Sequence, residues 1–227
     1  TAVGSTALDA NTSGTANTAV GKSSLSAVVS GDENTAVGYN TLAVNTASDN
    51  TAVGSTALDA NTSGASNTAV GKGSLSANIS GDENTAVGTN ALLLNTASDN
   101  TAVGSTALDA NTSGAGNTAV GVNTIGVNTT GDYNVAVGNE ALDANTTGSS
   151  NVAVGRSALG TNTTASNNTA VGQEAIAANT TGTSNTAVGY NAMAANTTAD
   201  GNTAVGYIAL FANTDGASNT AVGSRAL

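Results

Sequence analysis

The pentapeptide "NTAVG" at residues 17–21 returns, unchanged or nearly so, along the whole chain of 227 residues. Its closing glycine occurs fourteen times between Gly4 and Gly223, at a spacing of 17 residues except for two intervals of 16. Both short intervals lack one residue in "NTASDN", at 45–50 and 95–100, where the first copy reads "NTSGTAN". A site that tolerates deletion is typical of a turn, so this part of the repeat is predicted to be one.

The repeats cover residues 1–227 without a change of composition, which predicts a single repeat domain. Residues 1–50 and 51–100 are near copies of each other, each a block of 17, 17 and 16 residues. Because the chain begins at Thr1 and ends at Leu227 inside a repeat, we expect it to be part of a longer array.

Composition excludes several classes of function. The chain has no His, Cys, Trp or Pro, so the usual catalytic side chains are largely missing, and we expect neither an enzyme nor a bound cofactor or metal. A net charge of −11 disfavours a nucleic-acid partner, which needs a basic stripe. The longest aliphatic run is four residues, 91–94, far from the roughly 20 that span a bilayer, so no membrane insertion is expected.

Two positions of the repeat are expected to form the core. The Val before each glycine never changes, and the fourth residue after the glycine is always a large aliphatic. The Thr two residues before that Val becomes Val135 and Val152 in two copies, so Thr and Val are expected to share the inward face of a strand. In the second half of the repeat, alternation predicts that Leu8, Ala10 and Thr12 face inward along a second strand.

Each repeat is therefore predicted to form two short strands, which pair with their equivalents in the next repeat about 4.8 Å away. The predicted fold class is all-β: a parallel β-solenoid (β-roll) of about fourteen 17-residue coils, forming a rod on the order of 65 Å long. A helix over "STALDAN" is the alternative, because Ala and Leu favour helices. The β-branched Val29, Val44, Ile79 and Val127 on this segment favour a strand.

Turn residues recur with the same period. Glycine stands at both turns of the repeat, where left-handed backbone is expected. Asn11, Asn17 and their equivalents flank these turns, and their amides are expected to bond the turn backbone and to stack as ladders.

The residue between Thr and Val is alanine in all fourteen copies, and it is expected to face outward. Solvent would accept any side chain there, so constant smallness predicts close contact with another chain. We expect a parallel homotrimer whose contact row is Ala2, Ala19, Ala36, Ala52, Ala69, Ala86, Ala102, Ala119, Ala136, Ala153, Ala170, Ala187, Ala204 and Ala221.

"NTAVG", together with "NVAVG" at 134–138 and 151–155, resembles the head repeats of trimeric autotransporter adhesins. Similar arrays occur in bacteriophage tail fibres. The resemblance covers the whole chain and implies a left-handed parallel β-roll that trimerises, outside the cell, on a bacterial surface or a virion tail. The repeats here are longer than the adhesin units by two or three residues, which are expected to lie in the "NTTG" turn.

These features favour a structural and attachment segment of a trimeric surface fibre, which gives rigidity, reach and a repetitive surface to a protein or glycan receptor. Its ligand surface is expected at the variable position after the turn glycine; the alternative is ordinary solvated surface. Tyr190 and Tyr207 share this position in adjacent repeats and could offer an aromatic step to a sugar or a protein. The candidate residues are Lys22, Tyr39, Lys72, Asn139, Arg156, Gln173, Tyr190 and Tyr207.

Three alternatives remain open to different degrees. An ice-binding solenoid would use a Thr ladder as a regular hydroxyl array. Calcium binding is suggested by "SGDEN" at 30–34 and 80–84 and by "TGDYN" at 130–134, but the acids recur only in some coils, and acidic solvated turns are the simpler interpretation. Catalysis is disfavoured because pairs such as Asp32 and Glu33 are adjacent on an exposed turn rather than set across a cleft.

Overall fold

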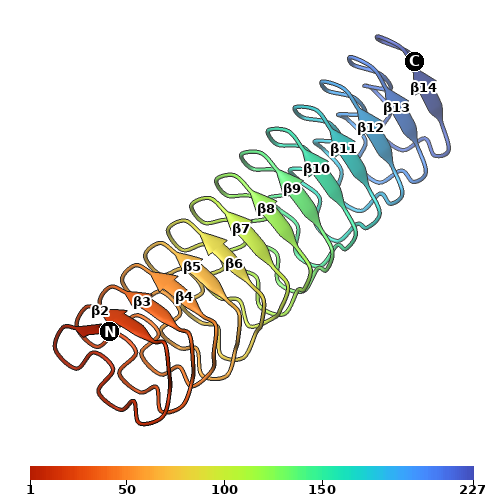
Figure 1. The fold of residues 1–227 in the computed structure, drawn as a ribbon. Coiled ribbons are helices and arrows are strands. Elements are labelled where there is room, and N and C mark those ends of the chain that lie inside the picture. Colours follow the sequence, from red (N-terminus) through yellow and green to blue (C-terminus); the bar gives the residue numbers. More distant parts are fainter. The chain divides into compact units, whose positions relative to one another are not determined.

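The computed structural model describes residues 1–227 as two compact units, Thr1–Ala115 and Gly116–Leu227. Each unit is an all-β parallel solenoid with one short strand per coil and no helix, and within each unit successive strands lie side by side in chain order (Figure 1). The strands of the first unit are β1 Ala2–Val3, β2 Thr18–Val20, β3 Thr35–Val37, β4 Thr51–Val53, β5 Thr68–Val70, β6 Thr85–Val87 and β7 Thr101–Val103. Those of the second are β8 Thr118–Val120, β9 Val135–Val137, β10 Val152–Val154, β11 Thr169–Val171, β12 Thr186–Val188, β13 Thr203–Val205 and β14 Thr220–Val222.

The predicted pairing of each strand with its equivalent in the next coil is confirmed within each unit. Thr18 pairs with Thr35 and Ala19 with Ala36 in parallel register. The register is kept across a short coil, where Thr35 pairs with Thr51. The missing residue is absorbed in the bend at 45–50, so the prediction of a turn at the deletion site is also confirmed.

The orientation predicted for this strand is wrong. Ala19 is fully buried inside its own coil, whereas Val20 is 37% exposed, and the same holds along both units. Every alanine of the row from Ala19 to Ala221 is buried at 0–3% exposure; Ala2, in the first coil, is exposed. The constant alanine therefore reflects a narrow coil interior and not a contact between chains.

The predicted second strand is also absent. The segment after the turn glycine is a series of turns in which the core leucine is left-handed, with φ between 47° at Leu25 and 55° at Met193. These residues bend the backbone so that one large aliphatic per coil reaches the centre, and the ladder from Leu25 to Met193 is fully buried, as expected for a core position. The alternative helix is not found either.

The position of Thr12 faces solvent rather than the core. Its two apolar replacements are exposed, Val29 by 47% and Ile79 by 52%. The position of Ala10 is open too, because Val44 is 42% exposed. Hydroxyls in this row bond the following coil, as when Thr46 Oγ1 donates to the Thr62 carbonyl at 2.7 Å.

Two ladders of buried asparagine hold successive coils together, and this expectation is confirmed. In the ladder that precedes each strand, the backbone N–H of Asn34 donates to Oδ1 of Asn17 at 2.9 Å, and Nδ2 of Asn17 donates to the carbonyl of Gly31 at 2.7 Å. In the ladder that follows the leucine, Nδ2 of Asn78 donates to Oδ1 of Asn61 at 2.8 Å. These bonds satisfy turn backbone that would otherwise be buried without partners.

The glycine that ends each strand is required by its conformation. Gly155 has φ of 133°, a region open only to glycine, and an added Cβ would lie 2.6 Å from the backbone of Gly172 in the next coil. The other recurrent glycine, such as Gly148, does not have positive φ, which corrects the expectation of left-handed backbone at both turns.

Candidate functional site

The outward side chains of the strands form one uncharged surface on each unit, which we call the Thr–Val face. In β2 to β8 it consists of one Thr and one Val per strand; Val135 and Val152 replace the Thr in β9 and β10. Most of these valines are 36–39% exposed, and the threonines are half-buried. The hydroxyls of Thr18, Thr35, Thr51, Thr68, Thr85 and Thr101 form no hydrogen bond within the chain.

The sequence contained a signal for this orientation. Asn17 precedes Thr18, and its amide must face inward to bond the next coil, as its two hydrogen bonds show. Period-two alternation then places Thr18 outside, Ala19 inside and Val20 outside. The buried asparagine thus determines which strand residues face inward and which face outward, and the constant valine does not.

The predicted ligand residues share one exposed position, the post-glycine row, directly after the turn glycine of each coil. In the first unit the row contains Lys22, Tyr39 and Lys72, and all three side chains are exposed. Backbone hydrogen bonds keep this row in register. The N–H of the residue after each member donates to the carbonyl of the member one coil earlier, as when Ile208 N donates to the Tyr190 carbonyl at 2.9 Å. In the second unit the row contains Asn139, Arg156, Gln173, Tyr190 and Tyr207.

Charge is partly neutralised within this region. Arg156 donates to Glu174 at 2.8 Å across one coil. Both side chains are more than a third exposed, so the pair contributes little to stability, about 0–1 kcal/mol. Arg156 remains a candidate contact whose guanidinium is already held in place.

Tyr190 and Tyr207 do come together. Their rings stack with centroids 5.5 Å apart and an interplanar angle of 13°, and the guanidinium of Arg225 lies 5.9 Å from the centroid of Tyr207. Each ring therefore has a face turned toward the other, and the guanidinium of Arg225 lies over the ring of Tyr207. A sugar that stacks on an open ring face gains less from this arrangement than the sequence suggested, because one face of each ring is turned toward the other ring.

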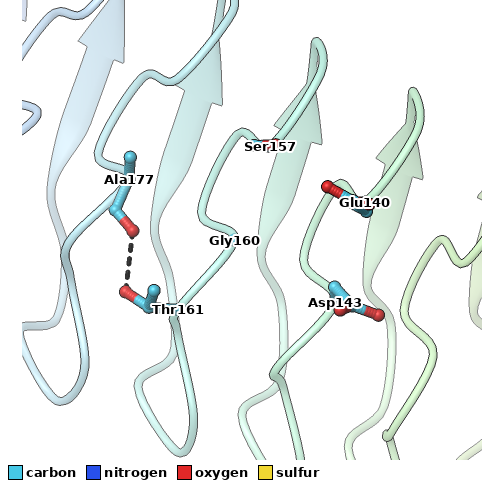
Figure 2. Close-up of a pocket in the computed structure, with 6 residues that line it drawn as sticks. All are labelled: Glu140, Asp143, Ser157, Gly160, Thr161 and Ala177. Atoms are coloured by element: carbon cyan, nitrogen blue, oxygen red, sulfur yellow. Dashed lines mark hydrogen bonds between the residues drawn. The ribbon is translucent and has the colours of Figure 1, made fainter.

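A hollow of about 240 Å³ lies on the second unit between successive coils (Figure 2). Glu140 and Asp143 come from one coil, Ser157, Gly160 and Thr161 from the next, and Ala177 from the one after. Gly160 and Ala177 stand at the position equivalent to Asp143 in the next two coils. Glycine has no side chain and alanine has only a methyl group, which leaves the space of the hollow. Thr161 Oγ1 is engaged, since it donates to the Ala177 carbonyl at 2.7 Å.

The chemistry of this hollow is that of two neighbouring carboxylates. Burial, and then the charge of Glu140, raises the pKa of Asp143, while a bond from the Gly126 backbone acts in the opposite direction. The lining contains no side chain that could act as a base for the Ser157 hydroxyl other than these acids, and no basic group. Sequence reasoning missed the hollow because it depends on which residues share one row in three successive coils.

The aspartates of the "SGDEN" turns accept hydrogen bonds from backbone N–H groups of the preceding coil. Oδ1 of Asp32 accepts from the backbone N–H of Thr15 at 2.6 Å and from its hydroxyl at 2.9 Å, and these bonds lower the pKa of Asp32. Asp200 accepts from Thr183 in the same way, with the same effect on its pKa. No group of three or more acidic or other ligating side chains is placed to hold a metal ion.

No helix in the structure has the length and apolar character needed to cross a bilayer. Comparison of the chain with protein-family models, with curated proteins and with solved structures found no match.

Proposed function

We propose that this chain is a repeat segment of a trimeric surface fibre, an adhesin head or a phage tail fibre, that provides reach, rigidity and a repetitive binding surface outside the cell. The Thr–Val face carries this proposal. The chain has a net charge of −11, so parallel copies repel one another wherever their charged rows meet. The Thr–Val face has no charged residue, and it repeats on every strand from β2 to β14.

The energetics of association favour the same face. Most coils leave more than a third of a valine in water, and a contiguous apolar stripe of this kind is typical of an interaction surface. The face is formed by short parallel strands in register, so a second and third parallel copy would meet the same side chains coil by coil. The alanine row lies inside each coil and takes no part.

Receptor contacts are assigned to the outer rows, which the Thr–Val face leaves free. The post-glycine row carries the changing side chains Lys22, Tyr39, Lys72, Arg156 and Tyr207, on a coil that keeps the same backbone. Such a surface suits a cell-surface or matrix protein or a glycan, bound through many weak contacts in a multivalent fibre.

The test is the absolute mass of the purified chain by light scattering on a sizing column over a range of concentrations. A mass of three times 21.4 kDa is expected. The triple variant Val53→Lys, Val70→Lys and Val87→Lys places three charges on the Thr–Val face and should give the monomer. A matched control, Ser30→Lys, Ser63→Lys and Ser80→Lys, adds the same charge at exposed turns and should remain trimeric. A monomeric parent chain would refute the proposal.

A second candidate function is ice binding, and one observation favours it. The unpaired hydroxyls from Thr18 to Thr101 alternate with valine methyl groups on short parallel strands about 4.8 Å apart. Such a regular array of hydroxyl and methyl groups can order water into an ice-like lattice.

Trimer assembly and ice binding would use the same face and exclude each other. Thermal hysteresis by the monomeric parent chain, lost in the triple lysine variant and kept in the serine-to-lysine control, would establish the second function. A trimer without thermal hysteresis would exclude it.

A further inference from the structure

The stacked pair Tyr190 and Tyr207 is also a site of chemistry. The backbone bond from Ile208 N to the Tyr190 carbonyl, at 2.9 Å, holds the two coils in register, and the ring centroids lie 5.5 Å apart at an angle of 13°. The two side chains are 42% and 48% exposed, so both rings are open to a reagent from solvent.

The composition of the chain directs oxidation to these rings. There is no Cys, Trp or His, and the one methionine, Met193, is fully buried. Sulfur and indole, which usually react first, are therefore absent or shielded. The four tyrosines are the accessible groups that a one-electron oxidant can attack.

We propose that Tyr190 and Tyr207 form a dityrosine cross-link when the protein meets hydrogen peroxide and a haem peroxidase. Each phenol gives one hydrogen atom to the peroxidase, which leaves two phenoxyl radicals. The radicals couple between ring carbons ortho to the oxygens, and loss of the two ring hydrogens from carbon to oxygen restores both phenols. In sum, two tyrosines and one hydrogen peroxide give one dityrosine and two waters.

Proximity makes this coupling intramolecular. Rings held at 5.5 Å meet without diffusion, so the reaction does not depend on protein concentration. The product joins two successive coils covalently through positions 17 residues apart in sequence. It would resist local opening of coils that are otherwise held together only by non-covalent contacts.

The other two tyrosines serve as controls within the chain. Tyr39 occupies the same row in the first unit, but its neighbours in that row are Lys22 and Ser55. Tyr133 lies over Gly116, whose added Cβ would be 2.7 Å from its ring. Neither has an aromatic partner, so each can couple only with a second molecule.

The experiment treats the folded chain with peroxidase and peroxide at a series of dilutions, then denatures it and cleaves it before aspartate. Cleavage at Asp200 separates Tyr190 from Tyr207 unless they are joined. We expect a joined peptide pair that has lost two hydrogen atoms, with dityrosine fluorescence and a yield independent of dilution. Urea-unfolded chain should lose this selectivity.

Matched variants decide the assignment. Tyr190→Phe keeps the ring packing and should abolish the joined pair, whereas Tyr39→Phe should leave its yield unchanged. Ser55→Tyr, next to Tyr39, should create a second joined pair. The proposal is overturned if the yield falls in proportion to dilution, if Tyr190→Phe retains the joined peptide, or if Tyr39 and Tyr133 enter cross-links as often as Tyr190.

Discussion

The backbone N–H of Asn168 donates a hydrogen bond of 3.0 Å to Oδ1 of Asn151 in the preceding coil. Nδ2 of Asn151 donates to the Ala165 carbonyl at 2.9 Å, so one buried amide bonds two backbone groups of the next coil. This relationship recurs from coil to coil within each unit, and it fixes both the stacking of the coils and the direction in which each strand faces.

Asn151→Ala is expected to destabilise the second unit strongly. It leaves the Asn168 N–H buried without a partner, at about 1–3 kcal/mol, and it removes one of the two amide bonds to the Ala165 carbonyl, which keeps the bond from Nδ2 of Asn162. Denaturant unfolding followed by circular dichroism measures the change. The control Asn139→Ala removes an exposed amide with one bond, to the Val122 carbonyl, and should cost less than about 1 kcal/mol. Equal losses in the two variants would contradict this role of the ladder.

Val28→Asn is expected to stabilise the first unit. Val28 interrupts the ladder that follows the leucine, and it leaves the buried Oδ1 of Asn11 without a partner. An asparagine at 28 would donate to Asn11 as Asn78 does to Asn61, for a gain of about 1 kcal/mol. The neighbouring Val29→Asn, at an exposed site, should have little effect. A lower unfolding temperature for Val28→Asn would show that the missing partner is not what limits this coil.

Gly155→Ala should cost more stability than Gly148→Ala. The first places a Cβ against the next coil at φ of 133°, where strain alone costs about 1–3 kcal/mol and the contact adds to it. The second also places a Cβ against the next coil, at the Ala165 carbonyl oxygen, but without positive φ, and the chain already accommodates alanine at the equivalent positions Ala165 and Ala199, so a smaller loss is expected. Thermal unfolding of both variants measures the difference, and the reverse order would show that the conformation of Gly155 is not essential.

Two aspartates should respond to pH with opposite signs. Burial and the charge of Glu140 raise the pKa of Asp143, so its ionised form opposes folding above that pKa, and the penalty is relieved as pH falls through it. Asp143→Asn should therefore raise the unfolding temperature at neutral pH, with a gain that shrinks in acid.

The bonds from Thr15 lower the pKa of Asp32, so its contribution to stability is present above the unfolded pKa and is lost as pH falls through the folded one. Asp32→Asn should lower the unfolding temperature at neutral pH, and this loss should also shrink in acid. Thermal scans from neutral to acid pH measure both differences. Changes of the same sign at neutral pH would contradict these assignments.

Sequence periodicity was sufficient for the repeat, the parallel pairing, the leucine core and the asparagine ladders. These features follow from positions that recur with constant chemistry, such as the buried amide before each strand. The orientation of the strand could not be read from Val and Ala in the same way, because a constant small residue fits either a crowded interior or a close contact between chains. The inward-facing amide of Asn17 resolves that ambiguity, because alternation then places Ala19 inside and Val20 outside.

The second half of the coil was harder to predict. Leucines with left-handed backbone are uncommon, because a side chain at positive φ costs energy, and propensity assigns Leu to strands or helices instead. In this fold the burial of one leucine per coil and the backbone bonds between coils, such as Leu25 N to the Thr41 carbonyl at 3.0 Å, outweigh that cost. The hollow near Asp143 and the tyrosine stack depend on side chains that differ between coils, so they were visible only in the structure.

The inward alanine and the outward valine are the central claim, because they determine which surface each unit offers to a partner. Comparison of the equilibrium unfolding of Ala86→Leu and Val87→Leu tests it most directly. Ala86 is fully buried and Val87 is 36% exposed. Leucine at 86 should overfill the coil and cost about 1–3 kcal/mol or more of unfolding free energy, while leucine at 87 should change it little. If Ala86→Leu instead keeps the unfolding free energy of the parent, and Val87→Leu loses it, the alanine row faces outward and the account is wrong.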